Sequence, residues 1–181
     1  MKFSIHPTLY LTLFSFLFVL QSCKKDDPEV INEEEEINRV TLQVTPSGGS
    51  ATSYTWNEGD GALSVALSSD TSYEVKVFFY DASDPNDIED ITEEVREEAD
   101  EHLVFYEIAS AAPAQISAAS NDTKDGDNVP VGLITTWTTS AAGSANAKLF
   151  LIHEPTNKAG SSRSAIGGET DVEVDLAINV N

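Results

Sequence analysis

The sequence predicts an all-β protein, an antiparallel β-sandwich that is immunoglobulin-like in broad architecture. Many short segments alternate apolar and polar residues with a period of two, which is typical of half-buried strands. Turns rich in Gly, Ser, Asn and Pro separate these segments, and one segment has helical periodicity. The repeated strand–helix–strand pattern of nucleotide-binding folds is missing. These observations favour two packed sheets, with a closed β-barrel as the alternative.

The alternation of apolar and polar residues predicts nine strands along the chain. In order, they fall at 40–45, around Tyr54 and Trp56, and at 63–67, 73–80, 103–108, 115–118, 133–138, 147–153 and 172–180. The segment 103–108 is apolar on both faces, so we expect it at the centre of a sheet. The last segment, 172–180, alternates without a fault, so we expect one buried and one solvated face.

One short acidic helix interrupts the strands. Apolar residues recur there at helical spacing: Ile88, Ile91, Val95 and Ala99. Asp90 lies three residues before Glu93, as in a capping box, and Asp84-Pro85 offers an earlier start. Acidic residues crowd the outer face of this segment. We therefore predict a helix between the fourth and fifth strands.

The N-terminus carries an apolar run, Leu9 to Leu20, that follows Lys2 and ends in Leu20-Gln21-Ser22-Cys23. This run fits the apolar region of a signal peptide and is shorter than the ~20 residues that a membrane-spanning helix needs. Leu three residues before Cys, with small Ser directly before it, fits a lipoprotein cleavage box. We predict a signal peptide at 1–22, with an uncleaved membrane anchor as the alternative.

Cys23 is the single cysteine of the chain, which excludes an intramolecular disulfide and a cysteine-based metal site. As the first mature residue it would carry a diacylglyceryl group and an N-acyl chain such as palmitate. Stable anchoring needs more than one acyl chain, and this modification supplies them. The sequence therefore predicts contact with the membrane through a lipid anchor on Cys23.

The residues that follow Cys23 predict a tether. Lys24-Lys25 and then acidic residues resemble a signal that sends lipoproteins to the outer face of the outer membrane, although a generic charged tether would look similar. The run Glu33 to Glu36 repels itself in any compact form. We predict that 23–36 is a disordered acidic arm with a reach on the order of 45 Å, and that 37–181 is the folded domain.

The chain has 181 residues and a formal net charge of −21, so its charge limits the partners it can bind. A surface this negative repels nucleic acid phosphates and anionic lipid head groups. We expect no nucleic acid partner. Divalent cations and cationic partners are favoured, and a well-solvated acidic exterior accounts for the same composition.

Several stretches together resemble a group of small acidic lipoproteins from Bacteroidota, and the likeness covers nearly the whole chain. The stretches are Asp90 to Glu94, Glu98 to His102, Val131-Gly132-Leu133, Leu151 to Pro155 and Gly167 to Val174. Members are labelled GTP cyclohydrolases or type 1 periplasmic-binding-fold proteins. The first activity needs a Cys/His zinc site, and the second fold needs two α/β lobes. The residues here supply neither, so the resemblance implies a location and no activity.

A calcium site is the one metal site that the sequence suggests. The loop 122–128 presents hard oxygen ligands around a glycine turn, from Asp122, Asp125, Asp127 and Asn128. Lys124 stands where an acid is expected, and the bidentate Glu of an EF-hand is missing. Plain turn chemistry explains the same residues. If the domain binds an ion, we predict calcium, with a role in loop stability.

Two histidines and three aromatic residues are further candidate site residues. His102 and His153 each lie beside an acid, Glu101 and Glu154, and two imidazoles with a carboxylate suit zinc or copper. His153 shares a strand face with apolar residues, which favours a buried structural histidine. The aromatic residues that could stack on a sugar, or lie in the core, are Tyr54, Trp56 and Trp137.

No activated nucleophile, glycine-rich phosphate loop or basic patch appears in the sequence, and acidic pairs are too frequent to indicate a glycosidase dyad. We therefore predict a non-enzymatic binding or structural module at the outer membrane or cell surface. The alternative is a hydrolase or glycan-binding protein that acts on an envelope or environmental polymer. The sequence does not decide between a glycan and a protein as the partner.

Overall fold

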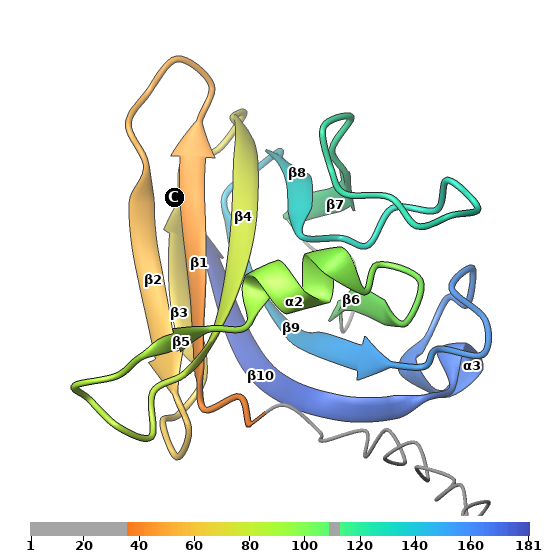
Figure 1. The fold of residues 1–181 in the computed structure, drawn as a ribbon. Coiled ribbons are helices and arrows are strands. Elements are labelled where there is room, and N and C mark those ends of the chain that lie inside the picture. The colour runs from red at the N-terminus through yellow and green to blue at the C-terminus, as the bar shows by residue number, and fades with distance from the viewer. Residues whose placement is uncertain (1–35, 109–112) are drawn as a thin grey trace, which may run out of the picture. The chain divides into compact units, whose positions relative to one another are not determined.

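Two β-sheets pack face to face in the computed structural model, which describes residues 36–108 and 113–181 (Figure 1). Sheet A has the order β2 (Thr52–Asn57), β1 (Arg39–Pro46), β4 (Ser72–Asp81), β8 (Ile134–Thr139), β7 (Ala114–Ala118), and β5 (Glu89–Asp90) pairs with β4. Sheet B has the order β3 (Leu63–Leu67), β10 (Glu169–Val180), β9 (Gly143–His153), β6 (His102–Ile108). The predicted β-sandwich is confirmed, and the sheets do not join into a closed barrel. The predicted signal peptide, Cys23 and the arm up to residue 35 lie outside the described residues.

The core lies between the two sheets, where the predicted alternation brings one face of each strand inward. Val40, Leu42 and Val44 of β1 are buried opposite Phe79, Val77 and Val75 of β4, which pair with them in that register. The main buried side chains of sheet B are Leu149, Leu151, Val174, Leu176 and Ile178. Because a strand alternates its side chains between faces, the pattern of apolar residues was enough to identify these positions.

One pair of strands departs from the antiparallel prediction. β3 runs parallel to β10, with Leu63 opposite Leu176 and Leu67 opposite Val180. The pairing buries the same apolar residues in either direction, so the alternation does not report strand direction. Direction follows instead from the end of the sandwich at which each connection enters the sheet.

The prediction that 103–108 is a central strand is wrong, because β6 is an edge strand of sheet B. Its outer face is apolar for another reason: the loop 154–168 folds back over it. Leu103 of β6 and Phe150 and Ile152 of β9 form a second buried cluster with Ile166 from that loop. A strand is therefore apolar on both faces when a loop covers it, even at the edge of a sheet.

The helix is shorter than predicted and a second helix is present. α2 spans Thr92–Glu97, and Val95 is its buried anchor toward the core. Ile88 lies outside it, with 47% of its surface exposed. Asp90 belongs to β5, where its carboxylate accepts a hydrogen bond from the Thr92 amide at 3.0 Å.

α3 (Arg163–Ile166) lies in the loop between β9 and β10, where residue periodicity predicts no helix. The Ser162 side chain caps it by accepting a hydrogen bond from the Ala165 amide, as serine does at helix N-termini. Its four residues are too few for helical periodicity to show in a sequence. Across the two described ranges, no helix combines the length and the apolar composition that crossing a membrane requires.

Candidate functional site

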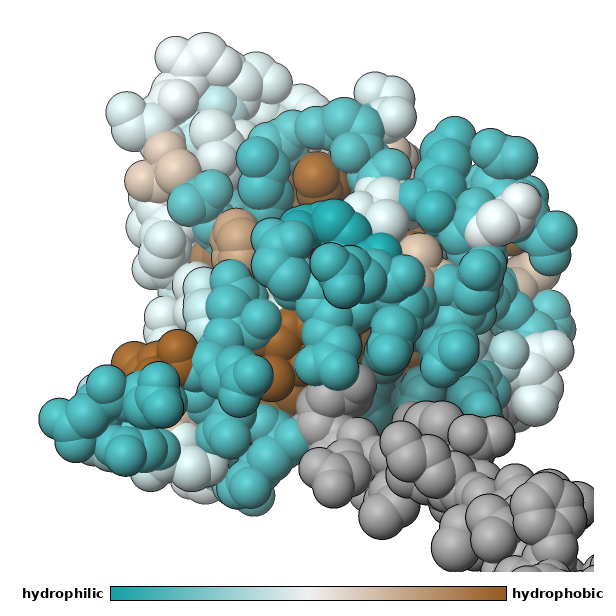
Figure 2. All heavy atoms as spheres, in the orientation of Figure 1, coloured by the Kyte–Doolittle hydropathy of each residue, from teal (hydrophilic) through white to brown (hydrophobic). Residues whose placement is uncertain are grey.

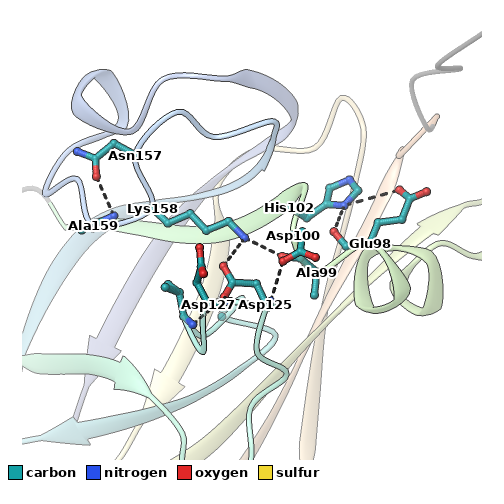
Figure 3. Close-up of polar contacts among 12 residues, drawn as sticks. Glu98, Ala99, Asp100, His102, Asp125, Asp127, Asn157, Lys158 and Ala159 are labelled. Carbon is teal, nitrogen blue, oxygen red and sulfur yellow. Dashed lines mark hydrogen bonds and ion pairs between the residues drawn. The ribbon is translucent and has the colours of Figure 1, made fainter.

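Three loops come together beside the C-terminal end of α2, and we call them the loop end (Figures 1 and 3). They are the turn 98–101, the loop 119–133 and the loop 154–168. Lys158 joins all three, because its Nζ donates to the Ala99 carbonyl at 2.7 Å and to Asp125 Oδ2 at 2.9 Å. The Lys158 and Asp125 side chains are only 12% and 6% exposed. The loop end is thus built around one partly buried ion pair.

Asp125 organises its own loop as well as binding Lys158. Its Oδ1 accepts hydrogen bonds from the amides of Asp127 at 3.0 Å and Val129 at 2.8 Å. Burial raises the pKa of the Asp125 carboxyl, but the hydrogen bonds from Lys158 and from these amides outweigh it, so the pKa is lowered. The ionised carboxylate is therefore part of the folded structure.

Replacing Asp125 with Asn is expected to destabilise the protein by about 2 kcal/mol at neutral pH, since hydrogen bonds to a charged group are lost. The folded pKa lies below the unfolded one. The stability that Asp125 contributes is therefore fully present above its unfolded pKa and disappears as the pH falls through the folded pKa.

Urea unfolding of both proteins at pH 7 and at about pH 3 measures this difference. Asp127→Asn is the matched control, because only the backbone amide of Asp127 makes the hydrogen bond. A difference between wild type and Asp125→Asn that stays constant over this pH range would contradict the expectation.

Asp122 has a different role from the one expected of a calcium ligand. Its side chain is buried, and its two oxygens accept hydrogen bonds from the amides of Gly132 at 2.7 Å and Ile134 at 2.8 Å. Burial raises the pKa of the Asp122 carboxyl, and the backbone amides around it oppose that shift. Asp122 fastens the loop to the start of β8.

The four residues predicted to bind calcium thus have separate surroundings. Asp122 binds the β8 backbone, Asp125 binds Lys158, and Asp127 is exposed. Asn128 has a left-handed backbone (φ 64°) and donates its amide to the Asp125 carbonyl at 3.0 Å. Within 36–108 and 113–181, no cluster of three or more His, Cys, Asp or Glu side chains is arranged to hold a metal ion. Calcium binding here stays a prediction.

Thermal melting decides the calcium prediction. Calcium at ten times its dissociation constant would add about 1.4 kcal/mol of stability and raise the melting temperature by a few degrees. Magnesium at matched ionic strength is the control, because screening of the negative surface raises stability with either ion. A calcium-specific rise that is lost in Asp125→Asn/Asp127→Asn identifies a site. Equal rises, or none, would refute it.

The two histidines do come together, on neighbouring strands of sheet B. His102 and His153 are paired in the register of β6 and β9, and their rings stack with centroids 5.0 Å apart and an interplanar angle of 12°. His102 Nδ1 lies 3.2 Å from the Glu98 carbonyl oxygen, and His153 Nε2 lies 3.7 Å from a Glu101 carboxylate oxygen. These two nitrogens have different partners, and in the described part of the chain no group of three or more metal-ligating side chains includes the pair. The pair packs as a buried structural element.

The predicted sugar-stacking aromatics face the core. Trp137 is fully buried, and its ring packs edge to face against the Tyr106 ring, with the two centroids 5.7 Å apart. Its Nε1 donates a hydrogen bond to Thr135 Oγ1 at 3.0 Å. Tyr54 and Trp56 pack against the core from β2. These three residues therefore follow the alternative interpretation, in which aromatic residues of strands pack in the core.

The outer face of sheet A has a surface depression that the sequence analysis did not indicate. A hollow of about 500 Å³, which we call the sheet A hollow, is lined by Arg39, Thr41, Thr55, Asn57, Tyr80 and Ile88. The polar alternation of β1 and the outward Tyr80 were visible in the sequence. What the sequence did not report was the register that aligns these residues.

A row of four paired residues runs along the outer face of sheet A, and its first three members line the sheet A hollow. Asn57 pairs with Arg39, Arg39 with Tyr80, and Tyr80 with Asp90, on β2, β1, β4 and β5. Arg39 Nε donates to the Asn57 side-chain oxygen at 2.9 Å, so the guanidinium meets an amide there and not a carboxylate. Burial raises the pKa of Tyr80, with a further rise from the Asp90 charge and a smaller opposing effect of Arg39. In the next row, the hydroxyls of Thr41 and Thr55 are 3.0 Å apart.

Comparisons with known proteins add little to this geometry. No family model matches the chain, and no curated protein matches it. Among solved structures, it is similar to domains 4 and 5 of the S-layer protein SbsC, at 10% identity over 78% of this chain and 75% of that chain. The TM-score is 0.28, and a similarity at this level carries no argument about function. The resemblance to Bacteroidota lipoproteins stays a prediction from the sequence.

Proposed function

We propose that this protein is a non-enzymatic binding or structural module, held at the outer face of the outer membrane by lipid on Cys23. The anchor is supported by the box at Leu20 to Cys23 and by the acidic arm that follows it. The module is the β-sandwich. The arm would hold it clear of the membrane surface.

One observation carries the non-enzymatic part of the proposal: the charged side chains at the centre of the loop end all bind other groups of the protein. Lys158 and Asp125 neutralise each other, and Asp122 holds backbone amides. A catalytic acid, base or nucleophile must instead be free to exchange a proton or form a bond with a substrate. The loop end therefore supports a rigid scaffold.

Cell fractionation tests the anchor. The wild-type protein is expected in the membrane fraction, and Cys23→Ala is expected in the soluble fraction, because it lacks the site of acylation. Cys23→Ser is a second variant, which keeps nearly the volume of the cysteine side chain and also lacks the acylation site. Retention of either variant in the membrane would refute lipid anchoring.

Two further measurements test the location and the chemistry. Protease treatment of intact cells is expected to remove the domain, and protection would place it on the periplasmic side. A panel of chromogenic glycoside and ester substrates is expected to show no turnover by the full-length protein purified in detergent. Turnover that disappears on replacing a single acid would make the protein a hydrolase and overturn the proposal.

A further inference from the structure

We propose that the sheet A hollow binds a neutral saccharide chain. This inference rests on the proposed function, since it names the ligand of the binding module. The hollow combines four kinds of group in a small area: a guanidinium, an amide, hydroxyls and the apolar surfaces of Tyr80 and Ile88. That combination matches a ligand with many hydroxyls and exposed C–H faces.

The polar groups are arranged to bind adjacent hydroxyls. Arg39 and Asn57 lie side by side on β1 and β2, with their side chains hydrogen-bonded at 2.9 Å. Arg39 carries further N–H donors. Asn57 Nδ2 donates to Asp60 Oδ2 at 3.1 Å, which leaves its second N–H and the second lone pair of its oxygen, so the pair can still serve both roles of a hydroxyl. Thr41 and Thr55 extend this surface by one row.

The apolar groups lie on the other side of the hollow. Tyr80 contributes a ring from β4, and Ile88 comes from the loop between β4 and β5. Ile88 is the large hydrophobic side chain that the described part of the chain leaves exposed. Figure 2 shows hydrophobic surface beside this projecting loop. Contact with the C–H face of a sugar ring would remove this surface from water, which is favourable.

Charge argues that the saccharide is neutral. The positive group Arg39 lines the hollow beside Tyr80, and the negative group Asp90 lies on the other side of Tyr80, on β5 and outside the lining. The protein as a whole has a net charge of −21 and repels polyanions. A neutral polyol is compatible with both the paired charges and the negative net charge, because it can hydrogen-bond to either group without bringing a charge of its own.

Binding is tested with the full-length protein, purified in detergent, on an array of neutral and uronic-acid oligosaccharides. The neutral oligosaccharide with the strongest signal is then titrated by calorimetry. We expect Tyr80→Ala and Arg39→Met each to weaken binding by about tenfold or more, as for loss of an aromatic contact or of a hydrogen bond to a charged group. Tyr80→Phe keeps the ring and is expected to retain most of the affinity.

Arg96→Ala is the matched control, because it removes an arginine from α2 that pairs with Glu93 away from the hollow. It is expected to leave binding unchanged, and circular dichroism melting checks that each variant is folded. If Tyr80→Ala does not fold, Arg39→Met alone decides the outcome. Binding that both hollow variants retain, or binding only to acidic saccharides, would overturn the inference. Absence of any saccharide binding would overturn it too, while leaving the anchored module intact.

Discussion

Replacing Gly132 with Ala is expected to lower the free energy of unfolding by about 3 kcal/mol or more, from backbone strain and overpacking together. Gly132 has φ +92°, and a Cβ at this position would lie 2.5 Å from the Val104 carbonyl oxygen. That part of β6 is held by a hydrogen bond from the Val104 amide to the Val131 carbonyl at 2.7 Å. The backbone must therefore shift where the loop end meets sheet B.

Gly48→Ala separates the two costs. Gly48 has φ +76°, and a Cβ there would meet nothing within 4 Å. Only the left-handed backbone is penalised, at about 1–2 kcal/mol. Urea unfolding of both variants measures the difference. A loss at Gly132 no larger than the loss at Gly48 would mean that the close approach to Val104 relaxes without cost.

Replacing Asp122 with Ala is expected to cost about 3 kcal/mol, because the amides of Gly132 and Ile134 lose their acceptor and each buried donor left unsatisfied costs about 1–3 kcal/mol. Asp122→Asn keeps the shape but offers one acceptor oxygen, and its NH₂ group faces a donor. We expect it to recover less than half of the loss.

Asp127→Asn is the control for a general effect of charge, because Asp127 is exposed in the same loop. It is expected to change the free energy of unfolding by less than about 0.5 kcal/mol. Hydrogen exchange at the Gly132 and Ile134 amides gives a second measurement and should accelerate in Asp122→Ala. Unchanged exchange at both amides would contradict the role assigned to Asp122.

The parts of the fold that were predicted correctly depend on local pattern. Each strand from β1 to β10, apart from the two-residue β5, has a predicted counterpart, because the pleat turns alternate residues to opposite faces. The errors arose where tertiary contacts replace that pattern. β6 is apolar on both faces because Ile166 covers it, and the helix is shortened because Asp90 pairs into β5.

The candidate sites divide in the same way. Strand alternation placed His153 inward, but its stacking on His102 depends on the pairing of β6 with β9. The sequence showed that the acidic residues of 122–128 lie in a loop. Their partners were not, because Lys158 lies 33 residues further along the chain from Asp125. A long-range ion pair leaves no trace in local composition.

The sequence by itself determined the class of fold, the positions of the strands and which side of each strand is buried, since these follow from residue periodicity and the hydrophobic effect. It also supplied the whole argument for the lipid anchor. The tertiary structure alone decided which strands are neighbours, in which direction and in which register. The row from Asn57 through Arg39 and Tyr80 to Asp90 exists only through that register. Register between distant segments is set by packing of the complete core, which no single stretch of sequence encodes.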